Sequence, residues 1–451
     1  MPLQRSGRRR FLATFGVGAV GALAGCAASS SSAPASLDWT PDEWPVAHGS
    51  PTNAGHSSVK NVPRSDPTVP EWKLWDVAES EPAVDKDWII DGLTSSPVVA
   101  GDTVFVATGL PRGSRDTDEG GLLALDATTG DLRWAAGLPE GGSGTPAVAG
   151  GLVIVGSNDR ALTAFDTASG SVRWRTTTSA PVGTPAVAGD HVYVGDGHGS
   201  VHAFCRMDGK LHWRFGQRTL TSLGSFLSDN TWRIRAKPAV TDDTVYVTTG
   251  IGEGDGPSTD AGNLIALSRS DGEERWRYEY RPKYGSYDVP RAPVVADGTV
   301  FVGDTTLHAV NAADGTRRWR FNSGCEVVSA PAVHDGTVYV SSKNVYALSA
   351  DDGSERWRFV NLAGMDGTIS RRVPMESAPV VTDGTVFVAA GALDSGTGEK
   401  LWGDLGNQAE GEYFYSSVDQ NAAVEGPAIT GDAVFMATQY GLILRVTEGG
   451  R

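Results

Sequence analysis

Alternating apolar and small polar residues recur in short runs along most of the chain. The unit that starts at Pro331 shows the pattern: two β-branched runs flank Asp335-Gly336, a dipeptide that favours a two-residue type I′ hairpin because glycine tolerates positive φ. Residues 344–348 and 356–359 form a third and a fourth run of the same kind. The unit therefore predicts a small antiparallel sheet of four strands. A proline just before the first strand is tolerated because that position need not donate to the ladder.

These units repeat at intervals typical of propeller blades. Eight of them begin with a proline, and the starts lie 38 to 55 residues apart, a longer period than that of most solenoid repeats. Seven also carry an alanine, a glycine six positions later and a tryptophan ten positions later. We therefore predict an all-β fold, an eight-bladed β-propeller of four-stranded antiparallel blades. The starts are Pro97, Pro146, Pro185, Pro238, Pro293, Pro331, Pro379 and Pro427, and the tryptophans are Trp134, Trp174, Trp213, Trp276, Trp319, Trp357 and Trp402.

The eighth unit lacks its second half. The chain runs from Pro427 to Arg451 without the glycine and tryptophan, whereas residues 71–77 form a strand-like segment with no preceding strands of its own. We predict that this N-terminal strand completes the C-terminal blade and closes the ring, which removes the open sheet edges of a linear array. Trp72 is the expected docking tryptophan of this strand, with Trp75 as the alternative.

Two further expectations concern the regularity of the ring. Ala392 follows Val388 by only four positions, against seven or more in the other units, so the seventh blade is expected to have a clipped hairpin or a short third strand. Beyond residue 26 no segment shows a sustained 3.6-residue apolar period, so no substantial helix is predicted there.

Residues 1–26 have the features of an export signal. Arg8, Arg9 and Arg10 precede an apolar stretch of about 15 residues, which is too short for a comfortable membrane span and suits a signal sequence. The arginines followed by Phe-Leu resemble a twin-arginine signal. Leu-Ala-Gly-Cys, ending at Cys26, resembles a lipobox, which implies that Cys26 carries a lipid. The alternative is an ordinary cleaved signal with an incidental cysteine.

With this signal, the chain divides into three predicted parts. Residues 1–26 are the predicted lipoprotein signal, residues 27–43 a flexible tether rich in Ser, Ala and Pro, and residues 44–451 the propeller. The predicted location is outside the cytoplasm, on the outer face of the cytoplasmic membrane, to which the lipid on Cys26 would attach the protein.

The composition narrows the classes of partner. The formal net charge is -16, and only eight of the 38 basic residues are lysine, a balance that resembles the acidic surfaces of salt-adapted archaeal proteins. A nucleic-acid partner is excluded because phosphate binding needs a cationic face. Cys205 and Cys325 fall in different predicted blades, so we expect two small buried residues, with a disulfide as the less favoured alternative.

The repeat itself resembles a known family. Residues 121–134, Gly-Leu-Leu-Ala-Leu-Asp-Ala-Thr-Thr-Gly-Asp-Leu-Arg-Trp, are similar to the repeat of pyrroloquinoline quinone (PQQ) enzymes. The resemblance covers nearly all of residues 44–446, and residues 44–56 resemble a segment that introduces many such propellers. It implies that the tryptophan of one blade docks on the neighbouring blade. The docking set is then Trp72 together with the seven repeat tryptophans.

Two branches of this family differ in function. The resemblance to quinoprotein dehydrogenases implies PQQ and calcium on the propeller axis, with an adjacent cysteine pair against the cofactor, but this sequence has no adjacent cysteines. The other branch contains non-catalytic lipoproteins, such as the bacterial scaffold of outer-membrane protein assembly. We favour this branch: no cofactor, no catalytic residue, a protein or envelope partner and a monomeric chain. The alternative is a PQQ-dependent dehydrogenase that oxidises an alcohol or a sugar.

Charged residues before several first strands are the candidate ligand site. In a propeller these positions face the mouth of the central channel, where cations would favour an anionic ligand, such as the PQQ carboxylates in the enzyme interpretation. The structural alternative is that the arginines and glutamates pair across the channel and fill it. The residues are Arg235, Lys237, Arg291, Arg371, Arg372, Glu376 and Glu425.

Aromatic residues in three long inserts suggest a third hypothesis, a carbohydrate-binding module, because such rings suit sugar faces or partner anchors. The alternative is that the loops pack their own aromatics. His198 and His202 lie four apart, a spacing that does not bring both to one metal on a strand and its turn, and no metal site is predicted. The insert aromatics are Trp232, Tyr278, Tyr280, Tyr284, Tyr287, Tyr413 and Tyr415.

Overall fold

The computed structural model describes most of the repeat region and none of the predicted signal or tether. Cys26 therefore lies outside the described residues, and within those residues no helix is long and apolar enough to cross a membrane. The described residues are 47–59, 62–64, 71–74, 76–77, 95–109, 119–216, 232–234, 236–251, 262–280, 291–303, 306–324, 329–342, 344–360, 378–388, 391–403, 426–437 and 442–448.

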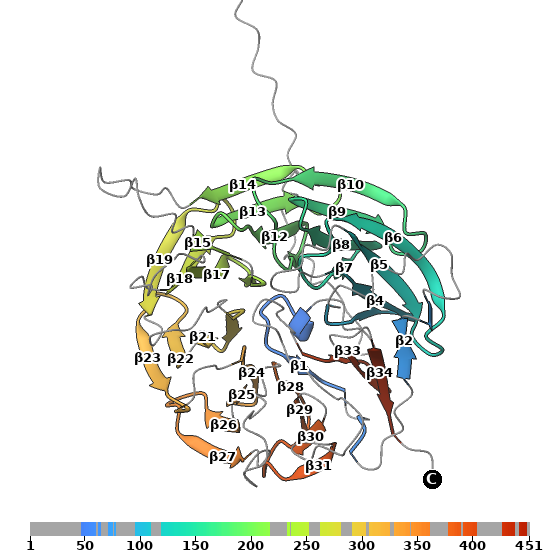
Figure 1. Ribbon diagram of the computed structural model, residues 1–451. Helices are drawn as coiled ribbons and strands as arrows, with labels where there is room; N and C mark the ends of the chain where they lie inside the picture. The colour runs from blue at the N-terminus through green and yellow to red at the C-terminus, as the bar shows by residue number, and fades with distance from the viewer. Residues whose placement is uncertain are drawn as a thin grey trace, which may run out of the picture.

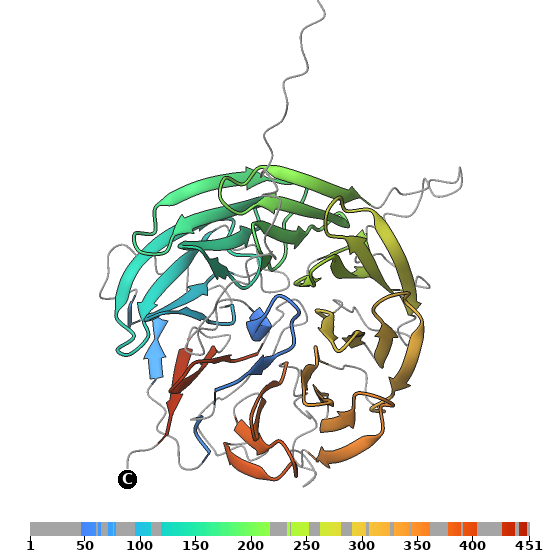
Figure 2. The ribbon, with the colours of Figure 1, turned by 180° about the vertical axis from the view of Figure 1, so that it is seen from behind.

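Eight small sheets stand around a central axis, as the ribbon shows from both sides (Figures 1 and 2). The predicted eight-bladed propeller is confirmed. Blade 1 consists of β3 (Val98–Ala100), β4 (Thr103–Ala107), β5 (Glu119–Asp126) and β6 (Leu132–Pro139). Blade 2 consists of β7 (Ala147–Ala149), β8 (Leu152–Ser157), β9 (Ala161–Asp166) and β10 (Val172–Thr177). Blade 3 consists of β11 (Ala186–Ala188), β12 (His191–Gly195), β13 (Ser200–Cys205) and β14 (Leu211–Gly216). Blade 4 consists of β16 (Ala239–Val240), β17 (Thr244–Ile251), β18 (Gly262–Ser268) and β19 (Glu274–Tyr280), with β15 (Trp232–Arg233) also paired to β17.

The second half of the ring has the same order of strands. Blade 5 consists of β20 (Val294–Ala296), β21 (Thr299–Gly303), β22 (Leu307–Asn311) and β23 (Arg317–Phe321). Blade 6 consists of β24 (Ala332–His334), β25 (Thr337–Ser341), β26 (Val345–Ser349) and β27 (Glu355–Phe359). Blade 7 consists of β28 (Val380–Thr382), β29 (Thr385–Val388), β30 (Gly391–Asp394) and β31 (Lys400–Gly403), with β1 (His56–Ser57) added to β28. Blade 8 consists of β32 (Ala428–Ile429), β33 (Ala433–Ala437), β34 (Leu442–Thr447) and β2 (Glu71–Lys73).

The first hairpin of each blade follows the sequence pattern. In blade 6, β24 begins directly after Pro331, and the turn residues Asp335 and Gly336 have φ values of 45° and 64°. Positive φ at both central residues is the backbone of a type I′ turn, which matches the twist of the flanking strands. Blade 7 is complete, and its third strand is short as expected, because β30 spans only Gly391–Asp394.

The alanine, glycine and tryptophan of the repeat meet at the boundaries between blades. In blade 5, Ala309 lies directly opposite Trp319 on the adjacent strand, so the small side chain leaves room for the indole ring. The ring then packs on Gly353 of blade 6, where an added Cβ would lie 2.6 Å from Trp319 Cε3. Trp319 Nε1 also donates a hydrogen bond to the Ala350 carbonyl at 2.9 Å. Each repeat therefore supplies the tryptophan for one boundary and the glycine for the other.

The same contact recurs around the ring and confirms the predicted docking of tryptophan on the next blade. Every one of the receiving glycines has a positive φ, a conformation that other residues adopt only with strain. The pairs are Trp134 with Gly170, Trp174 with Gly209, Trp213 with Gly272, Trp276 with Gly315 and Trp357 with Gly398.

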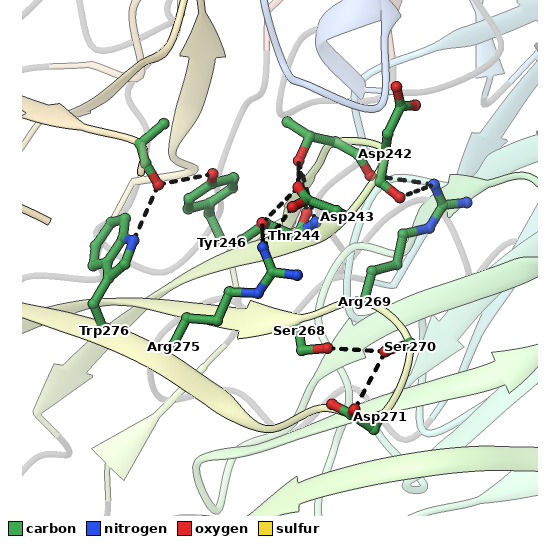
Figure 3. A network of polar contacts seen from close by, with 12 residues as sticks. Asp242, Asp243, Thr244, Tyr246, Ser268, Arg269, Ser270, Asp271, Arg275 and Trp276 are labelled. Atoms are coloured by element: carbon green, nitrogen blue, oxygen red, sulfur yellow. Dashed lines mark hydrogen bonds and ion pairs between the residues drawn. The ribbon is translucent and has the colours of Figure 1, made fainter. Parts of the chain in front are cut away.

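A polar network strengthens these boundaries, and Figure 3 shows it in blade 4. Trp276 Nε1 and the Tyr246 hydroxyl both donate to the Ala312 carbonyl of blade 5, at 3.0 and 3.3 Å. On the other side, Arg269 donates to the Tyr193 hydroxyl of blade 3 at 3.0 Å. Arg275 pairs with Asp243 at 2.6 Å, which joins the outermost strand to the first hairpin of the same blade. Blade 4 is thus joined by hydrogen bonds to both neighbours.

The N-terminal strand closes the ring as predicted. β2 pairs antiparallel with β34, with Trp72 opposite Ile443, and Trp72 packs on Gly130 of blade 1. In both ribbon views β2 lies beside β34 at the join between the two ends of the chain. Blade 8 has no glycine turn for Trp402, whose Nε1 instead donates to the Pro63 carbonyl at 2.7 Å. Trp75, the alternative docking residue, lies outside the described residues.

One expectation about the cysteines is wrong. Cys205 is buried, as expected, but it is disulfide-bonded rather than free. Its partner lies outside the described residues, since neither of the other two cysteines of the chain falls within them. Sequence reasoning disfavoured a disulfide because Cys205 and Cys325 belong to different repeats, and distance in sequence is a weak guide in a closed ring.

We predict that Trp319→Ala lowers the free energy of unfolding by about 3–5 kcal/mol, because it leaves a cavity at the boundary between blades 5 and 6. Chemical denaturation followed by fluorescence measures the loss. Val360→Ala, at an exposed apolar position, is the control and should change little. An unchanged denaturation midpoint for Trp319→Ala would contradict the docking role.

The partner glycine permits a double-mutant cycle. Gly353→Ala should destabilise the parent protein because its Cβ would overlap Trp319 and because φ is +74°. In the Trp319→Ala background the overlap is gone and only the backbone strain, about 1 kcal/mol, should remain. Equal costs in the two backgrounds would show that the glycine is not required by the indole ring.

Candidate functional site

The central channel contains residues 47–57 of the chain itself, which we call the leader. Residues Ala47–Gly49 form a single 3-10 turn, η1, which both ribbon views place at the centre of the ring. The chain then runs outward to β1, which adds to the innermost strand of blade 7 in parallel, with His56 opposite Val381. The sequence resemblance marked residues 44–56 as an introductory segment but did not indicate where this segment lies.

Four successive blades hold the leader through the same position. The innermost strand of a blade is a sheet edge, and its N–H groups need partners when the channel is filled. In blades 4 to 7 the second residue of this strand donates to a leader carbonyl. Val240 N donates to Pro51 O (2.8 Å), Val295 N to Thr52 O (2.9 Å), Val333 N to Ala54 O (2.8 Å) and Val381 N to Gly55 O (2.8 Å).

Asn53 is the best-enclosed side chain of the leader. It is fully buried, and its backbone has φ of 61°, a left-handed conformation in which asparagine is over-represented. Its Nδ2 lies 2.9 Å from the Pro293 carbonyl and 3.3 Å from the carbonyls of Lys237 and Pro238. One amide thus contacts blades 4 and 5 together, which orients the leader within the ring.

Lys237, one of the predicted funnel cations, is part of this attachment. Its side chain is fully buried, and Nζ donates to the carbonyls of Ser50, at 2.9 Å, and Ala47. Hydrogen bonds from a charged donor are stronger than neutral ones, and they offset part of the cost of burying the ammonium. The described contacts of Lys237 are with the protein's own backbone, so we assign it an anchoring role. The positions before the first strands of blades 5, 6 and 7 carry alanine instead: Ala292, Ala330 and Ala378.

The structure describes little of the remaining funnel. Arg291 is half-buried, and its carbonyl accepts a hydrogen bond from the Thr248 hydroxyl at 2.9 Å. Whether the predicted cations converge is therefore not tested, and the set stays a prediction. The other members, Arg235, Arg371, Arg372, Glu376 and Glu425, lie outside the described residues.

The insert aromatics that the structure describes belong to strands. Tyr280 is in β19, is buried, and packs against the ring of His308 with centroids 5.8 Å apart. The Tyr278 hydroxyl lies 3.0 Å from His308 Nδ1, and burial, reinforced by the nearby arginines, lowers the pKa of His308 to about 4. Tyr280 and Tyr278 therefore fit the packing alternative better than a sugar platform. Trp232 is in β15, and Tyr284, Tyr287, Tyr413 and Tyr415 lie outside the described residues.

A buried carboxylate pairs with His202 inside blade 3. Asp196 is fully buried, and its Oδ2 lies 3.0 Å from His202 Nε2, while Oδ1 accepts the N–H groups of His198 and Ser200 at 2.9 Å. Burial alone would raise the pKa of Asp196, but these hydrogen bonds outweigh it and hold the pKa below the usual value. The pair orders the turn between β12 and β13. The ring of His198 is exposed, so the two histidines do not share a ligand position.

A second cluster of titratable groups lies where the leader meets blades 6 and 7. His56 of β1 stacks on His334 of β24, with ring centroids 3.9 Å apart and planes 8° from parallel. Asp383, in the turn after β28, places Oδ1 3.2 Å from His334 Nε2 and 3.9 Å from His56 Nε2. No sequence spacing predicts this cluster, because its members come from the leader and from two different repeats.

The comparisons with known proteins identify the family. A family model described as "Outer membrane protein assembly factor BamB" matches residues 71–253, 118–293 and 260–451, which together span most of the chain. The chain belongs to this family. The resemblance to PQQ repeats drawn from the repeat sequence is thereby confirmed. No curated protein matches the sequence.

Solved structures share the fold at low identity. Quinohemoprotein alcohol dehydrogenase from Comamonas testosteroni superimposes with a TM-score of 0.66 at 14% identity, covering 93% of this chain and 84% of that one. A europium-containing methanol dehydrogenase gives 0.61 at 14% identity, covering 92% and 99%. BamB from Moraxella catarrhalis gives 0.48 at 16% identity, covering 85% and 100%. The first two superpositions, with TM-scores of 0.66 and 0.61, show the propeller fold, and at 14% identity they leave the function of this family member to be argued from its own residues.

The described part of the channel does not fit an axial PQQ. The backbone of residues 47–55 occupies the centre of the ring and takes the inward-facing N–H groups of four blades. Lys237, which the enzyme interpretation assigns to a PQQ carboxylate, donates instead to Ser50 and Ala47. A cofactor at the level of residues 47–55 would have to displace these residues together with their hydrogen bonds.

Exposed apolar side chains lie on the outer strands of blades 2 and 3 and in the last turn of blade 3. Among the described residues, three of the four exposed large apolar side chains are Val172, Met207 and Leu211, which we name the rim patch. They belong to one boundary, because Trp174 of β10 packs on Gly209 in the turn between β13 and β14. Figure 1 shows β10 and β14 next to each other on the outer rim.

We predict that Lys237→Met loosens the leader. The substitution keeps an apolar stem but removes the Nζ donor to two leader carbonyls, which should lower the local opening free energy by about 1.5–3 kcal/mol. Hydrogen exchange at residues 47–57 should then be about 10- to 100-fold faster, while the outer strands keep their rates. Lys210→Met, at an exposed surface lysine, is the matched control. Unchanged exchange at the leader would contradict the anchoring role of Lys237.

Proposed function

We propose that this protein is a non-catalytic, lipid-anchored β-propeller outside the cytoplasm that binds another protein or an envelope component. The observation that carries the proposal is the leader in the channel. A propeller offers ligands its axis or its outer surfaces, and here residues 47–55 take the axis within the described part of the ring. The faces and the rim then remain for recognition. Membership of a family described as an assembly factor supports a protein partner.

The predicted N-terminal segments complete the proposal. Residues 1–26 direct export, the lipid on Cys26 holds the chain at the outer face of the cytoplasmic membrane, and residues 27–43 connect the lipid to the leader. The propeller acts as a monomer, and two observations support this. β2 and β34 close the ring within one chain, so the closing strand comes from the same molecule. Blade 8 also reaches four strands with β2, as many as blades 2 and 3 have, so it needs no strand from a second copy.

The rim patch is the part of the described surface that we assign to the partner. Val172 lies in β10, Leu211 in β14 and Met207 in the turn between β13 and β14, so regular strands hold the backbone at two of the three positions. Apolar anchors on a rigid rim surrounded by polar residues are the usual arrangement of a protein contact. The net charge of -16 favours a partner whose polar rim is basic.

The first experiment tests whether the protein is an enzyme. The purified chain is incubated with PQQ and calcium in high salt, and dye-linked oxidation of alcohols and sugars is followed together with the cofactor absorbance. We expect neither turnover nor a stoichiometric cofactor spectrum, because the leader occupies the axis. An apo-quinoprotein dehydrogenase reconstituted in parallel is the positive control. Sustained turnover would overturn the proposal in favour of the PQQ-dependent dehydrogenase.

The second experiment tests the partner surface. The intact chain is crosslinked in its host membranes, extracted, and analysed by mass spectrometry. Val172→Ser, Met207→Ser and Leu211→Ser together should reduce the yield of the main crosslinked protein by about tenfold, since each removes an apolar anchor. Val360→Ser, which changes the remaining exposed apolar side chain of the described set, should leave the yield unchanged. Equal recovery from both variants would exclude the rim patch.

A further inference from the structure

The cluster of His56, His334 and Asp383 joins three separate parts of the fold. His56 lies in the leader, His334 at the end of the innermost strand of blade 6, and Asp383 in the first turn of blade 7. Their potential ligand atoms all lie within 4.8 Å of one another. Two imidazoles and a carboxylate form a common ligand set for zinc and related first-row divalent ions, whereas calcium and magnesium prefer oxygen ligands alone.

The backbone around the cluster is well fixed. Hydrogen bonds to the carbonyls of Ala54 and Gly55 place the residues just before His56, and the pairing with Val381 places His56 itself. Gly55 has a φ of +64°, and a Cβ there would lie 3.0 Å from the Cβ of Ala332, so the leader approaches blade 6 as closely as the backbone allows. The backbone that carries His56 is therefore positioned by main-chain contacts that do not depend on a bound ion.

The distances require only a small movement to suit a metal. In a tetrahedral zinc site with bonds of about 2.0–2.1 Å, neighbouring ligand atoms are about 3.3 Å apart. His334 Nε2 and Asp383 Oδ1 are already 3.2 Å apart, and His56 Nε2 is 3.9 Å from the same oxygen. The two stacked rings must also tilt so that both lone pairs point at one ion. The side chains of His56 and His334 are 28% and 27% exposed and that of Asp383 is 42% exposed, so the cluster lies near the protein surface.

The nitrogen of His56 is available to such an ion. His56 Nε2 is buried and makes no hydrogen bond to any described residue. A buried polar nitrogen without a partner is costly, and a bound ion would supply that partner.

We propose that His56, His334 and Asp383 bind one zinc ion, or a first-row divalent ion of the same ligand preference, which attaches the leader to blades 6 and 7. The hydrogen bonds to the edge strands join main-chain atoms only. The ion would add a link between side chains of the leader and of blades 6 and 7. The three ligands come together only when the leader lies in the channel, so binding of the ion would stabilise this position of the leader by mass action. The site does not depend on which partner the propeller binds.

The test is a titration of the metal-stripped, purified full chain with zinc chloride in a calorimeter, with a chromophoric chelator as competitor. We expect one tight equivalent. His334→Gln and Asp383→Asn should each weaken the affinity at least tenfold, because either removes one of three protein ligands. His198→Gln, which changes an exposed histidine elsewhere, is the matched control and should leave the titration unchanged. Circular dichroism without metal verifies that each variant is folded.

A second measurement, hydrogen exchange, tests whether the bound ion attaches the leader to blades 6 and 7 or only binds at the surface. Hydrogen exchange at residues 47–57 should slow when zinc is added to the parent protein or to His198→Gln, and should not respond in His334→Gln. If the parent binds no zinc, or if its affinity survives both ligand substitutions, the proposal is wrong. Tight zinc binding without any change in hydrogen exchange at residues 47–57 would contradict the proposal that the ion attaches the leader.

Discussion

The contact between a tryptophan and a glycine of the next blade is the interaction on which the ring depends. An indole ring can lie flat on a backbone only where no Cβ intervenes, and at each receiving glycine the added atom would come within 2.5–2.7 Å of the ring. The glycine must also adopt a positive φ, which the short turn before the fourth strand requires. The same glycine therefore serves both the turn of its own blade and the packing of the preceding blade's tryptophan. This explains why the spacing from glycine to tryptophan stays constant while loop lengths vary.

This constraint explains how much of the fold was predictable. The glycine turn, the alanine opposite Trp319 and the Asp335-Gly336 hairpin are local features, so their spacing survives in the sequence and predicts blades, strand order and closure by Trp72. The disulfide of Cys205 was not predictable in this way, because its two cysteines need only meet in space. Strands depend on local sequence, whereas a side-chain site depends on residues that meet only in the folded ring. The sequence therefore predicts the strands better than any site.

The candidate site shows the limit most clearly. The sequence marks Lys237 as a funnel candidate by its place before a first strand, but its contacts depend on the leader, whose path carries no periodic signal. A lysine at a position where the next three repeats have alanine was the available clue. The cluster of His56, His334 and Asp383 had none, since three segments that lie far apart in sequence meet only after the ring has closed and the leader is seated.

Closure of the ring also has a consequence for the order in which the molecule can assemble. Blades 1 to 7 can stack on one another as the polypeptide emerges from the ribosome, each covering the indole of its predecessor. The N-terminal residues of the propeller cannot reach their final positions until the last blades have been synthesised. The hydrogen bond from Trp402 to the Pro63 carbonyl, for example, joins residues 339 positions apart. Nascent chains must therefore keep their beginning unengaged until synthesis is almost finished, and long-range pairing of this kind is slow. Translocation of a finished, prefolded molecule would suit this timing better than threading of an extended one.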